Sequence, residues 1–499
     1  MIKKYFYLSV VLLFMTALAC SLPSRLLSTD KDEPTEEATT IEENQIPSEI
    51  EIQTPAEEEE LSLEASEDEV QEPTMESEEP IEEQSAQVPP PPPSGAVIHP
   101  EDLVYQGAFR LPDEAGESGW DYSGTAMAFY PDGDPGGPQD GFPGSLFASG
   151  SDVTFDVAEI SIPQPVNSRN LGDLPTAGVL QPFQDISAGT IDPGAYELPR
   201  LGLEYLAPQG NQTSGKLYFS VGQHFQEFEP SHGCREVDLS NSNIAGLWVF
   251  DGYCNYTTND YIFEIPKAWA DQFTPGQYLA TGRAREGPWS GNGPALFAFG
   301  PWNDGSPPNS GAALSSISPL LLYGIQQPDS PEIVTDQTMS IDNRFNCDHW
   351  LGGSWLTAGE NAAVIFAGTK AIHRCWYGFA NGVEWPYDCA ETNSCPEVPE
   401  WPNDDRGFWA DDYIAQIIFF DPADLAAVVS GTIETWDPQP YAALDITEFM
   451  YNPEIVPADY KRDILGAAAF DRANGLLYIA ERLADGYKSV IHVWQVQRR

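Results

Sequence analysis

Gly466-Ala-Ala-Ala-Phe-Asp471 is the first of three short apolar segments near the end of this sequence; the others are Leu476–Glu481 and Val490–Val496. Turn-forming Gly, Asn and Asp residues separate them. Short apolar runs bounded by such turns are typical of antiparallel β-strands. The same start, a glycine that leads into an apolar strand, recurs at five places, which begin at Gly124, Gly202, Gly293, Gly353 and Gly466.

Further strands follow these glycines. Second strands are expected at Ser145–Gly150, Lys216–Gly222, Pro319–Gly324, Ala363–Gly368 and Leu476–Glu481. Third strands are expected at Val157–Ile162, Gly246–Phe250, Tyr413–Phe420 and Val490–Val496, and outer strands at Val179–Phe183 and Tyr441–Ile446.

Repeated four-stranded antiparallel units are the pattern of a β-propeller. The glycines fit because innermost strands crowd around the ring axis, where only small residues let backbones approach. We therefore predict an all-β fold with five blades over residues 96–499, or six if a poorly marked blade lies between Gly353 and Gly466. Two packed β-sandwiches are the alternative.

The last unit has three strands, and Leu103–Leu111 at the start of the domain belongs to no unit. An open ring would expose a strand edge on each side of the gap. We therefore expect Leu103–Leu111 to supply the fourth strand of the last blade and close the ring.

The N-terminus has the layout of an export signal. Lys3 and Lys4 precede an apolar stretch, Tyr5–Ala19, that is too short to span a bilayer. It ends in Ala17-Leu18-Ala19-Cys20, which resembles the lipobox of bacterial lipoproteins, although Leu usually stands where Ala17 stands here. The resemblance implies removal of residues 1–19, lipidation of Cys20, and a protein anchored to a membrane of the cell envelope, outside the cytoplasm. An ordinary cleaved signal, with Cys20 incidental, is the alternative.

Residues 20–95 differ sharply in composition from the rest. The segment 22–95 holds 23 acidic and 2 basic residues, has no aromatic residue, and ends in a proline run at 89–93. Such a segment cannot bury enough apolar surface to fold, so we expect a disordered stalk. From Gly95 onward the chain still carries 54 acidic and 19 basic residues, which makes nucleic acid a poor partner.

Six cysteines follow the stalk, and an even number in an exported protein indicates disulfides. Pairing between nearest neighbours would close three short loops. The expected pairs are Cys234–Cys254, Cys347–Cys375 and Cys389–Cys395.

Propellers bind ligands on the loops that lead into their innermost strands, which selects a short set of polar and aromatic residues. The candidate ligand-binding residues are Asp121, Arg200, Glu204, Asp348, His349, Trp350 and Asp463. Carboxylates and a histidine beside tryptophans suit a sugar site. In architecture and residue class the set resembles five-bladed glycosidases of the arabinanase type. No motif of that family is present, so no catalytic residue is assigned. These side chains also suit solvated loops or structural hydrogen bonds.

Asp132-Gly-Asp134, with Asp140 further on, resembles a calcium loop because hard cations take several oxygens on a bent backbone. Pro143 stands where an EF-hand would have a bidentate Glu, so the loop is not of that type. Calcium is the only cofactor suggested; an ordinary turn is the alternative.

No nucleophile elbow, zinc-binding HExxH or phosphate-binding glycine loop occurs. The layout of stalk and head favours a surface-displayed binding or interaction module whose ligand is a carbohydrate or an envelope protein. An extracellular glycan-active hydrolase that uses acids at the channel mouth is the alternative.

Overall fold

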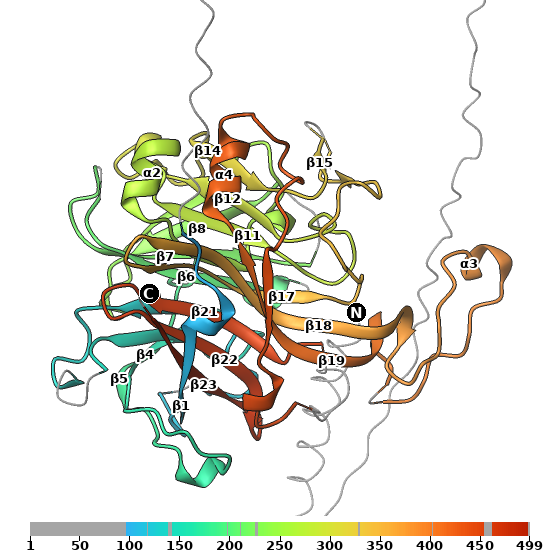
Figure 1. Cartoon of the computed structure of the whole chain (residues 1–499), viewed down its shortest axis with the longest axis horizontal. Helices are drawn as coiled ribbons and strands as arrows, with labels where there is room; N and C mark the ends of the chain where they lie inside the picture. The colour runs from blue at the N-terminus through green and yellow to red at the C-terminus, as the bar shows by residue number, and fades with distance from the viewer. Residues whose placement is uncertain are drawn as a thin grey trace, which may run out of the picture. The chain divides into compact units, whose positions relative to one another are not determined.

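The computed structural model describes residues 96–497 except 117, 138–141, 197, 210, 225–227, 328–329, 402 and 454–461. The predictions for the signal, Cys20 and the stalk therefore lie outside the described residues. The described part is an all-β propeller with five blades (Figure 1). Among these residues, no helix is both long enough and apolar enough to cross a membrane.

Each blade is a four-stranded antiparallel sheet, and its strands are named from the innermost one outward. Blade 1 consists of β2 (Met127–Tyr130), β3 (Ser145–Ser149), β4 (Asp156–Ser161) and β5 (Val179–Asp185). Blade 2 consists of β6 (Arg200–Leu206), β7 (Lys216–Gly222), β8 (Pro230–Arg235) and β9 (Ile244–Phe250), extended by β13 (Ala313–Leu314). Blade 3 consists of β10 (Tyr261–Glu264), β11 (Leu279–Arg283), β12 (Ala295–Phe299) and β14 (Ile317–Leu321).

The remaining elements follow the same plan. Blade 4 consists of β17 (His349–Ala358), β18 (Asn361–Phe379), β19 (Arg406–Phe420) and β20 (Ala442–Asp445). Blade 5 consists of β21 (Leu465–Asp471), β22 (Leu476–Asp485), β23 (Lys488–Val496) and β1 (Leu103–Arg110). The connections hold α2 (Lys267–Phe273), α3 (Cys389–Thr392), α4 (Pro422–Val429) and a small sheet of β15 (Ile325–Gln326) and β16 (Ile333–Val334).

The predicted closure of the ring is confirmed. Strand β1 pairs antiparallel with β23, from Leu103 opposite Val496 to Arg110 opposite Val490. A buried polar chain reinforces the pairing: the Tyr105 hydroxyl lies 2.9 Å from His492 Nδ1, and His492 Nε2 lies 2.8 Å from Glu481.

Blades 2 and 3 correct the strand predictions. Gly293 precedes the third strand of blade 3, not the innermost one, which is β10. Pro319–Gly324 overlaps the outer strand β14, and Gly246–Phe250 is part of the fourth strand of blade 2 rather than the third. Strand β10 needs no glycine because its neighbours supply the space: a Cβ on Gly353 would lie 2.7 Å from the Phe263 ring.

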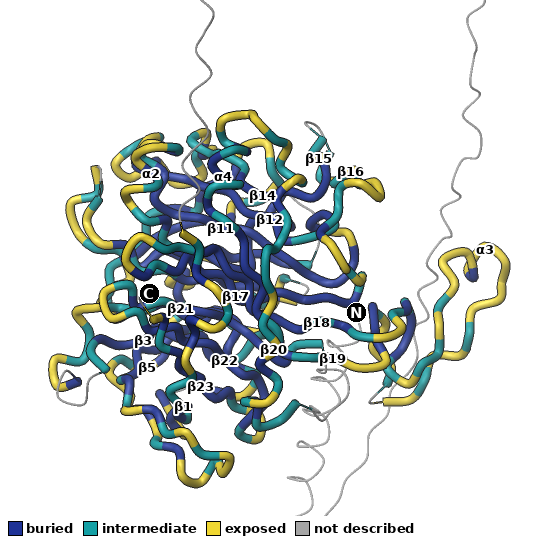
Figure 2. The backbone as a smooth tube through the Cα atoms, in the orientation of Figure 1, coloured by how far each residue is buried: buried dark blue, intermediate teal, exposed yellow. Residues whose placement is uncertain are grey.

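The hydrophobic core lies between neighbouring blades, so the innermost strands are buried and the exposed residues gather in the connections (Figure 2). Between blades 5 and 1, for example, Ala467 and Tyr478 pack with Met127 and Leu146. Large side chains fill the space left by small inner-strand residues, as a packed interior requires.

The ring has two faces that we name by strand direction. At the N-face the innermost strands begin, and at the C-face they end. The folded chain enters at the C-face, where the Ile98 amide donates to the Ala362 carbonyl at 3.2 Å beside the turn between β17 and β18. The chain entry and the N-face are therefore at opposite ends of the ring.

One hairpin rises from the N-face. Thr369 of β18 pairs with His349, the first residue of β17. Strand β18 continues beyond this pair to Phe379, and β19 pairs with it along the extension. We call residues 370–413 the arm; in Figure 1 it is the orange hairpin that leads to α3. At about 3.3 Å per residue, its strands extend roughly 30 Å beyond the blade.

Candidate functional site

Charged side chains from four blades meet at the N-face. Their positions are the starts of inner strands and the ends of the strands beside them. We call this set the arginine cluster: Arg200, Arg283, Arg285, Arg462 and Arg482, with Asp260, Glu286, His349 and Asp463.

His349 joins two carboxylates in the cluster. It is the first residue of β17 and is 2% exposed. Its Nδ1 is hydrogen-bonded to Asp463, and its Nε2 lies 3.9 Å from Glu286 Oε2. The structure thus brings together two of the candidate residues, His349 and Asp463, and adds Glu286 to them.

Both of these carboxylates are held ionised. Burial alone would raise the pKa of Asp463, but His349, Arg482 and Arg200 lower it well below its ordinary value. Burial likewise opposes ionisation of Glu286, and Arg285 and His349 outweigh it, so that its pKa is also well below the usual range. Neither group holds a proton at neutral pH.

Arg283 and Asp260 form the buried centre of the blade 3 side. Arg283 Nε lies 3.3 Å from Asp260 Oδ2, and both side chains are fully buried. The guanidinium also donates to the Gln223 carbonyl at 3.0 Å and lies over the Tyr256 ring, 3.9 Å from its centroid. Arg200 adds a longer contact, with its Nε 3.8 Å from Asp260 Oδ1.

Arg482 anchors the blade 5 side. Its guanidinium lies 3.3 Å from Asp463 Oδ2 and 2.8 Å from Asp152 Oδ2. It also donates to the carbonyls of Ser123 and Tyr122, each at 3.2 Å, in the loop before β2. A single side chain from β22 therefore ties blade 5 to the start of blade 1.

A half-exposed aromatic residue borders the cluster. Trp289 is 43% exposed, and its ring centroid lies 5.8 Å from that of Tyr256, which also carries Arg283. His224, whose Nδ1 is 3.1 Å from Arg285 Nη1, lies 6.2 Å from the Trp289 ring. Burial, together with the positive charges of Arg285 and Arg283, lowers the pKa of His224 to about 3.

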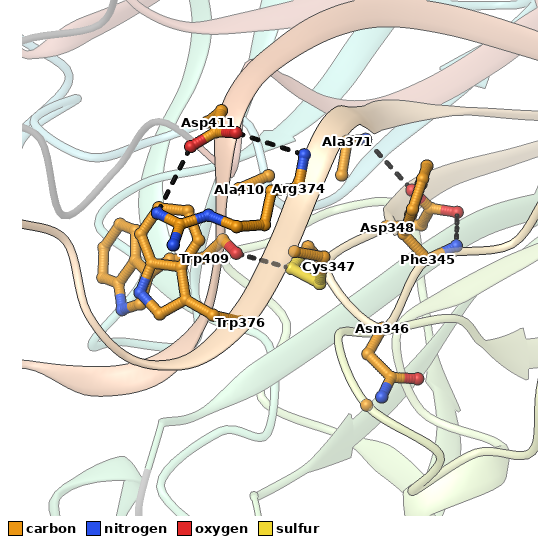
Figure 3. Close-up of a disulfide and its surroundings, with 12 residues drawn as sticks. Phe345, Asn346, Cys347, Asp348, Ala371, Arg374, Trp376, Trp409, Ala410 and Asp411 are labelled. Atoms are coloured by element: carbon orange, nitrogen blue, oxygen red, sulfur yellow. Dashed lines mark hydrogen bonds and ion pairs between the residues drawn. A yellow bond between two sulfur atoms is a disulfide. The ribbon is translucent and has the colours of Figure 1, made fainter. Parts of the chain in front are cut away.

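The arm holds a cavity of about 290 Å³ beside the cluster. Trp376 and Trp409 stand directly opposite each other on β18 and β19 and both line it. Arg374 lies over Trp376 at 4.6 Å, and Arg462 lies over Trp409 at the same distance, so the cluster and the arm are continuous. Figure 3 shows Arg374 and the two tryptophans near Cys347.

The other predicted site residues have different surroundings. Asp348 is buried and accepts from Lys370 Nζ at 2.9 Å. It also accepts from the Ala371 amide at 3.0 Å (Figure 3), so it fixes the base of the arm. Trp350 packs in the hydrophobic core between blades 3 and 4. Asp121 is exposed at the rim of the N-face.

Glu204 lies toward the C-face, away from the cluster. Its neighbours there are Glu264 and Arg472, and Arg472 lies 3.2 Å from Glu264 Oε2. Burial first, and then the charge of Glu264, raise the pKa of Glu204 well above its ordinary value.

Two of the three expected disulfides are present, Cys347–Cys375 and Cys389–Cys395, and both belong to the arm or its base. The pair Cys234–Cys254 was wrongly predicted, because both thiols are free. Cys234 faces Ala245 near the beginning of β9, whereas Cys254 follows the far end of that strand. The separation exceeds the roughly 7 Å between Cα atoms that a disulfide tolerates.

The expected calcium loop is only partly described, because Asp140 lies outside the described residues. Asp134 accepts from the Gly136 amide at 3.2 Å, as in an ordinary turn. No group of three or more metal-binding side chains occurs among the residues that the structure describes. A site that includes Asp132, Asp134 and Asp140 stays a prediction.

The cluster contains residues that the sequence interpretation missed. Asp260 directly precedes β10, and Arg283, Arg285 and Glu286 follow from β11; all were missed because Gly293 was taken as the start of the inner strand. Arg482 was missed because it lies inside a strand that reads as apolar. The run Arg283-Ala-Arg-Glu286 at the end of an apolar strand is the signal that could have marked the site.

The sequence matches neither any model of a known protein family nor any curated protein. The function must therefore be inferred from the site itself.

Proposed function

We propose that this protein is a lipid-anchored, extracytoplasmic binding module that holds a carbohydrate at its N-face. The two disulfides indicate an oxidising environment, in agreement with an exported protein. Anchoring at Cys20 and the carbohydrate ligand are the parts of this proposal that experiments must test.

One observation carries the proposal: the arginine cluster and the arm lie at the face opposite the chain entry. The folded chain begins beside Ala362 at the C-face, and the segment that leads to Cys20 precedes it. An anchor that precedes this entry would leave the N-face, at the opposite end of the ring, free for a ligand.

The side chains at this face suit a sugar. Trp289, which is 43% exposed, offers an aromatic face next to the polar groups of the arginine cluster. Aromatic faces pack against the apolar faces of sugar rings, while charged and amide groups bind the hydroxyls. Large aromatic side chains that stay exposed are characteristic of binding surfaces.

The protonation of the acids favours binding over hydrolysis. A glycosidase needs one carboxylic acid that keeps its proton at working pH. At the N-face, Asp463 and Glu286 both have lowered pKa values and are paired with cations. Glu204 has a raised pKa but lies near the C-face, so it supports the hydrolase alternative only for a ligand bound there.

A glycan array with the unlipidated Cys20→Ser chain tests carbohydrate binding. We expect binding that falls at least tenfold in Trp289→Ala and is unchanged in Trp401→Ala, a matched loss of an exposed tryptophan on the arm. Loss of binding in Trp401→Ala but not in Trp289→Ala would instead place the binding site at the tip of the arm. Binding to no glycan would refute the proposal. Release of products that stops in Glu204→Gln would support the hydrolase instead.

Metabolic labelling with a palmitate analogue tests the anchor. The wild-type chain should be labelled and Cys20→Ala should not, because Cys20 is the residue in the lipobox-like motif. Equal labelling of both chains would contradict lipidation at this position.

A further inference from the structure

We propose that the arginine cluster receives the carboxylate of an acidic sugar, so that the ligand is a glycan containing uronic acid. This inference rests on the proposed function and narrows its ligand class.

The first support is a local concentration of positive charge. Arg200 and Arg283 share Asp260, while Arg285 pairs with Glu286 at 3.0 Å. Arg462 pairs with Asp405, and Arg482 pairs with Asp152 and Asp463. Five arginines thus converge at one face of a chain that is otherwise strongly acidic.

The second support is unused hydrogen-bonding capacity. Within the described residues, Arg283 Nη2 is buried and has no hydrogen-bond partner, and Arg200 Nε has only the long ion pair with Asp260 at 3.8 Å. Buried donors of this kind are rare in folded proteins because an unmade hydrogen bond is costly, and they commonly mark the position of an absent ligand, ion or water. The side chains of Arg200 and Arg283 are 9% and 0% exposed, respectively.

The third support is mutual repulsion among the arginines. Burial lowers the pKa of Arg283 to about 10, with Arg285 and Arg200 adding to the effect against the attraction of Asp260. The pKa of Arg200 is also lowered, first by burial and then by the positive charge of Arg285. A bound anion would relieve both effects, which is the usual reason for several cations to converge on a site.

The residue type of the cations and the nearby aromatic side chain indicate which kind of anion would bind. Every permanently charged cation of the cluster is arginine, whose planar fork fits a carboxylate with two parallel hydrogen bonds. Trp289 and His224 are the partly exposed residues next to Arg285 and Arg283. A sugar ring on Trp289 would therefore carry its carboxylate toward the arginines.

The test measures the affinity of the Cys20→Ser chain for a galacturonic acid hexamer, for the same hexamer with its carboxyl groups reduced to alcohols, and for a sulfated neutral hexamer. We expect binding of the acid form at least 100-fold tighter than that of the reduced form. Arg200→Lys keeps the charge but loses the fork, and it should weaken the acid form at least tenfold. Arg472→Lys, at the C-face, should leave the affinity unchanged.

The outcomes separate this inference from the proposed function. If the acid and reduced hexamers bind equally well and both lose binding in Trp289→Ala, the carboxylate assignment is wrong. The proposed carbohydrate binding at the N-face would still hold. Preference for the sulfated hexamer would also overturn it. Binding of none of the three, in a chain that binds other sugars on the array, would exclude the uronic acid. If Arg200→Lys fails to fold, two other results still support the inference: a 100-fold preference of the Cys20→Ser chain for the acid hexamer over the reduced one, and loss of binding to the acid hexamer in Trp289→Ala. Equal affinity for the acid and reduced hexamers refutes it.

Discussion

The two faces of this propeller are the opposite ends of the same five blades, yet their charged residues differ in burial and in contacts. At the N-face, Arg482 is 1% exposed and contacts two carboxylates and two backbone carbonyls. At the C-face, Arg472 is 28% exposed and contacts a single carboxylate, that of Glu264, as well as the Glu264 and Trp355 carbonyls and the Thr357 hydroxyl. Buried ion pairs are costly to desolvate. The contrast supports the proposed placement of the ligand site at the N-face.

The largest expected effect concerns the closure of the ring, where β1 pairs with β23. A chain that starts at Pro112 lacks β1, and with it the buried side chains of Ala108 and Phe109. Removal of β1 opens the edge of β23, so we expect loss of cooperative thermal unfolding. The matched control starts at Ala86 and keeps β1. Identical melting of the two chains, measured by calorimetry, would mean that β1 does not stabilise the ring.

The second effect compares the two arginines directly. Arg482→Met should lower the free energy of unfolding by about 3–5 kcal/mol, because it breaks buried ion pairs with Asp463 and Asp152 and two hydrogen bonds to backbone carbonyls. Arg472→Met should lower it by at most about 1 kcal/mol, since its ion pair is partly solvated. Urea unfolding of both variants measures the difference. A loss for Arg472→Met as large as that for Arg482→Met would remove the contrast between the faces.

The two faces should also respond to pH with opposite sign. The lowered pKa of Asp463 gives stability that is present above its unfolded pKa, near ~4, and lost as the pH falls through the folded value. Asp463→Asn should therefore cost about 2 kcal/mol at pH 7, and less in acid. The raised pKa of Glu204 gives stability that is present below ~4 and lost as the pH rises.

Glu204→Gln should accordingly raise the stability at pH 7 by up to about 1 kcal/mol, and the gain should vanish toward pH 4. Thermal melts of both variants between pH 3 and 8 check the two signs. Destabilisation by Glu204→Gln at neutral pH would show that this carboxyl is ionised in the folded protein.

Particular residues show how far the sequence could lead. The glycines at 124, 202, 353 and 466 marked four of the five blades, because crowding at the ring axis leaves a local signal. Strand β10 left none, since Gly353 provides space from the neighbouring blade for Phe263. Because Gly293 was taken as the start of the inner strand of blade 3, Asp260 and the arginines of β11 were not recognised as site residues.

The site itself was only half predictable. Arg200, His349 and Asp463 could be found because each stands at the start of an inner strand. Arg482 could not, because its role depends on a loop from blade 1 that is 360 residues away in sequence. Asp348 and Trp350 stand beside His349 in sequence, but their side chains serve the arm and the core.

Hydrogen–deuterium exchange of the Cys20→Ser chain, with and without the galacturonic acid hexamer, tests most directly whether the ligand binds at the N-face. We predict slower exchange at 285–289 and 223–224 on the N-face, and no change at 472–475 on the C-face. Slower exchange at 472–475, with none at 285–289, would place the ligand at the C-face and contradict a binding site in the arginine cluster.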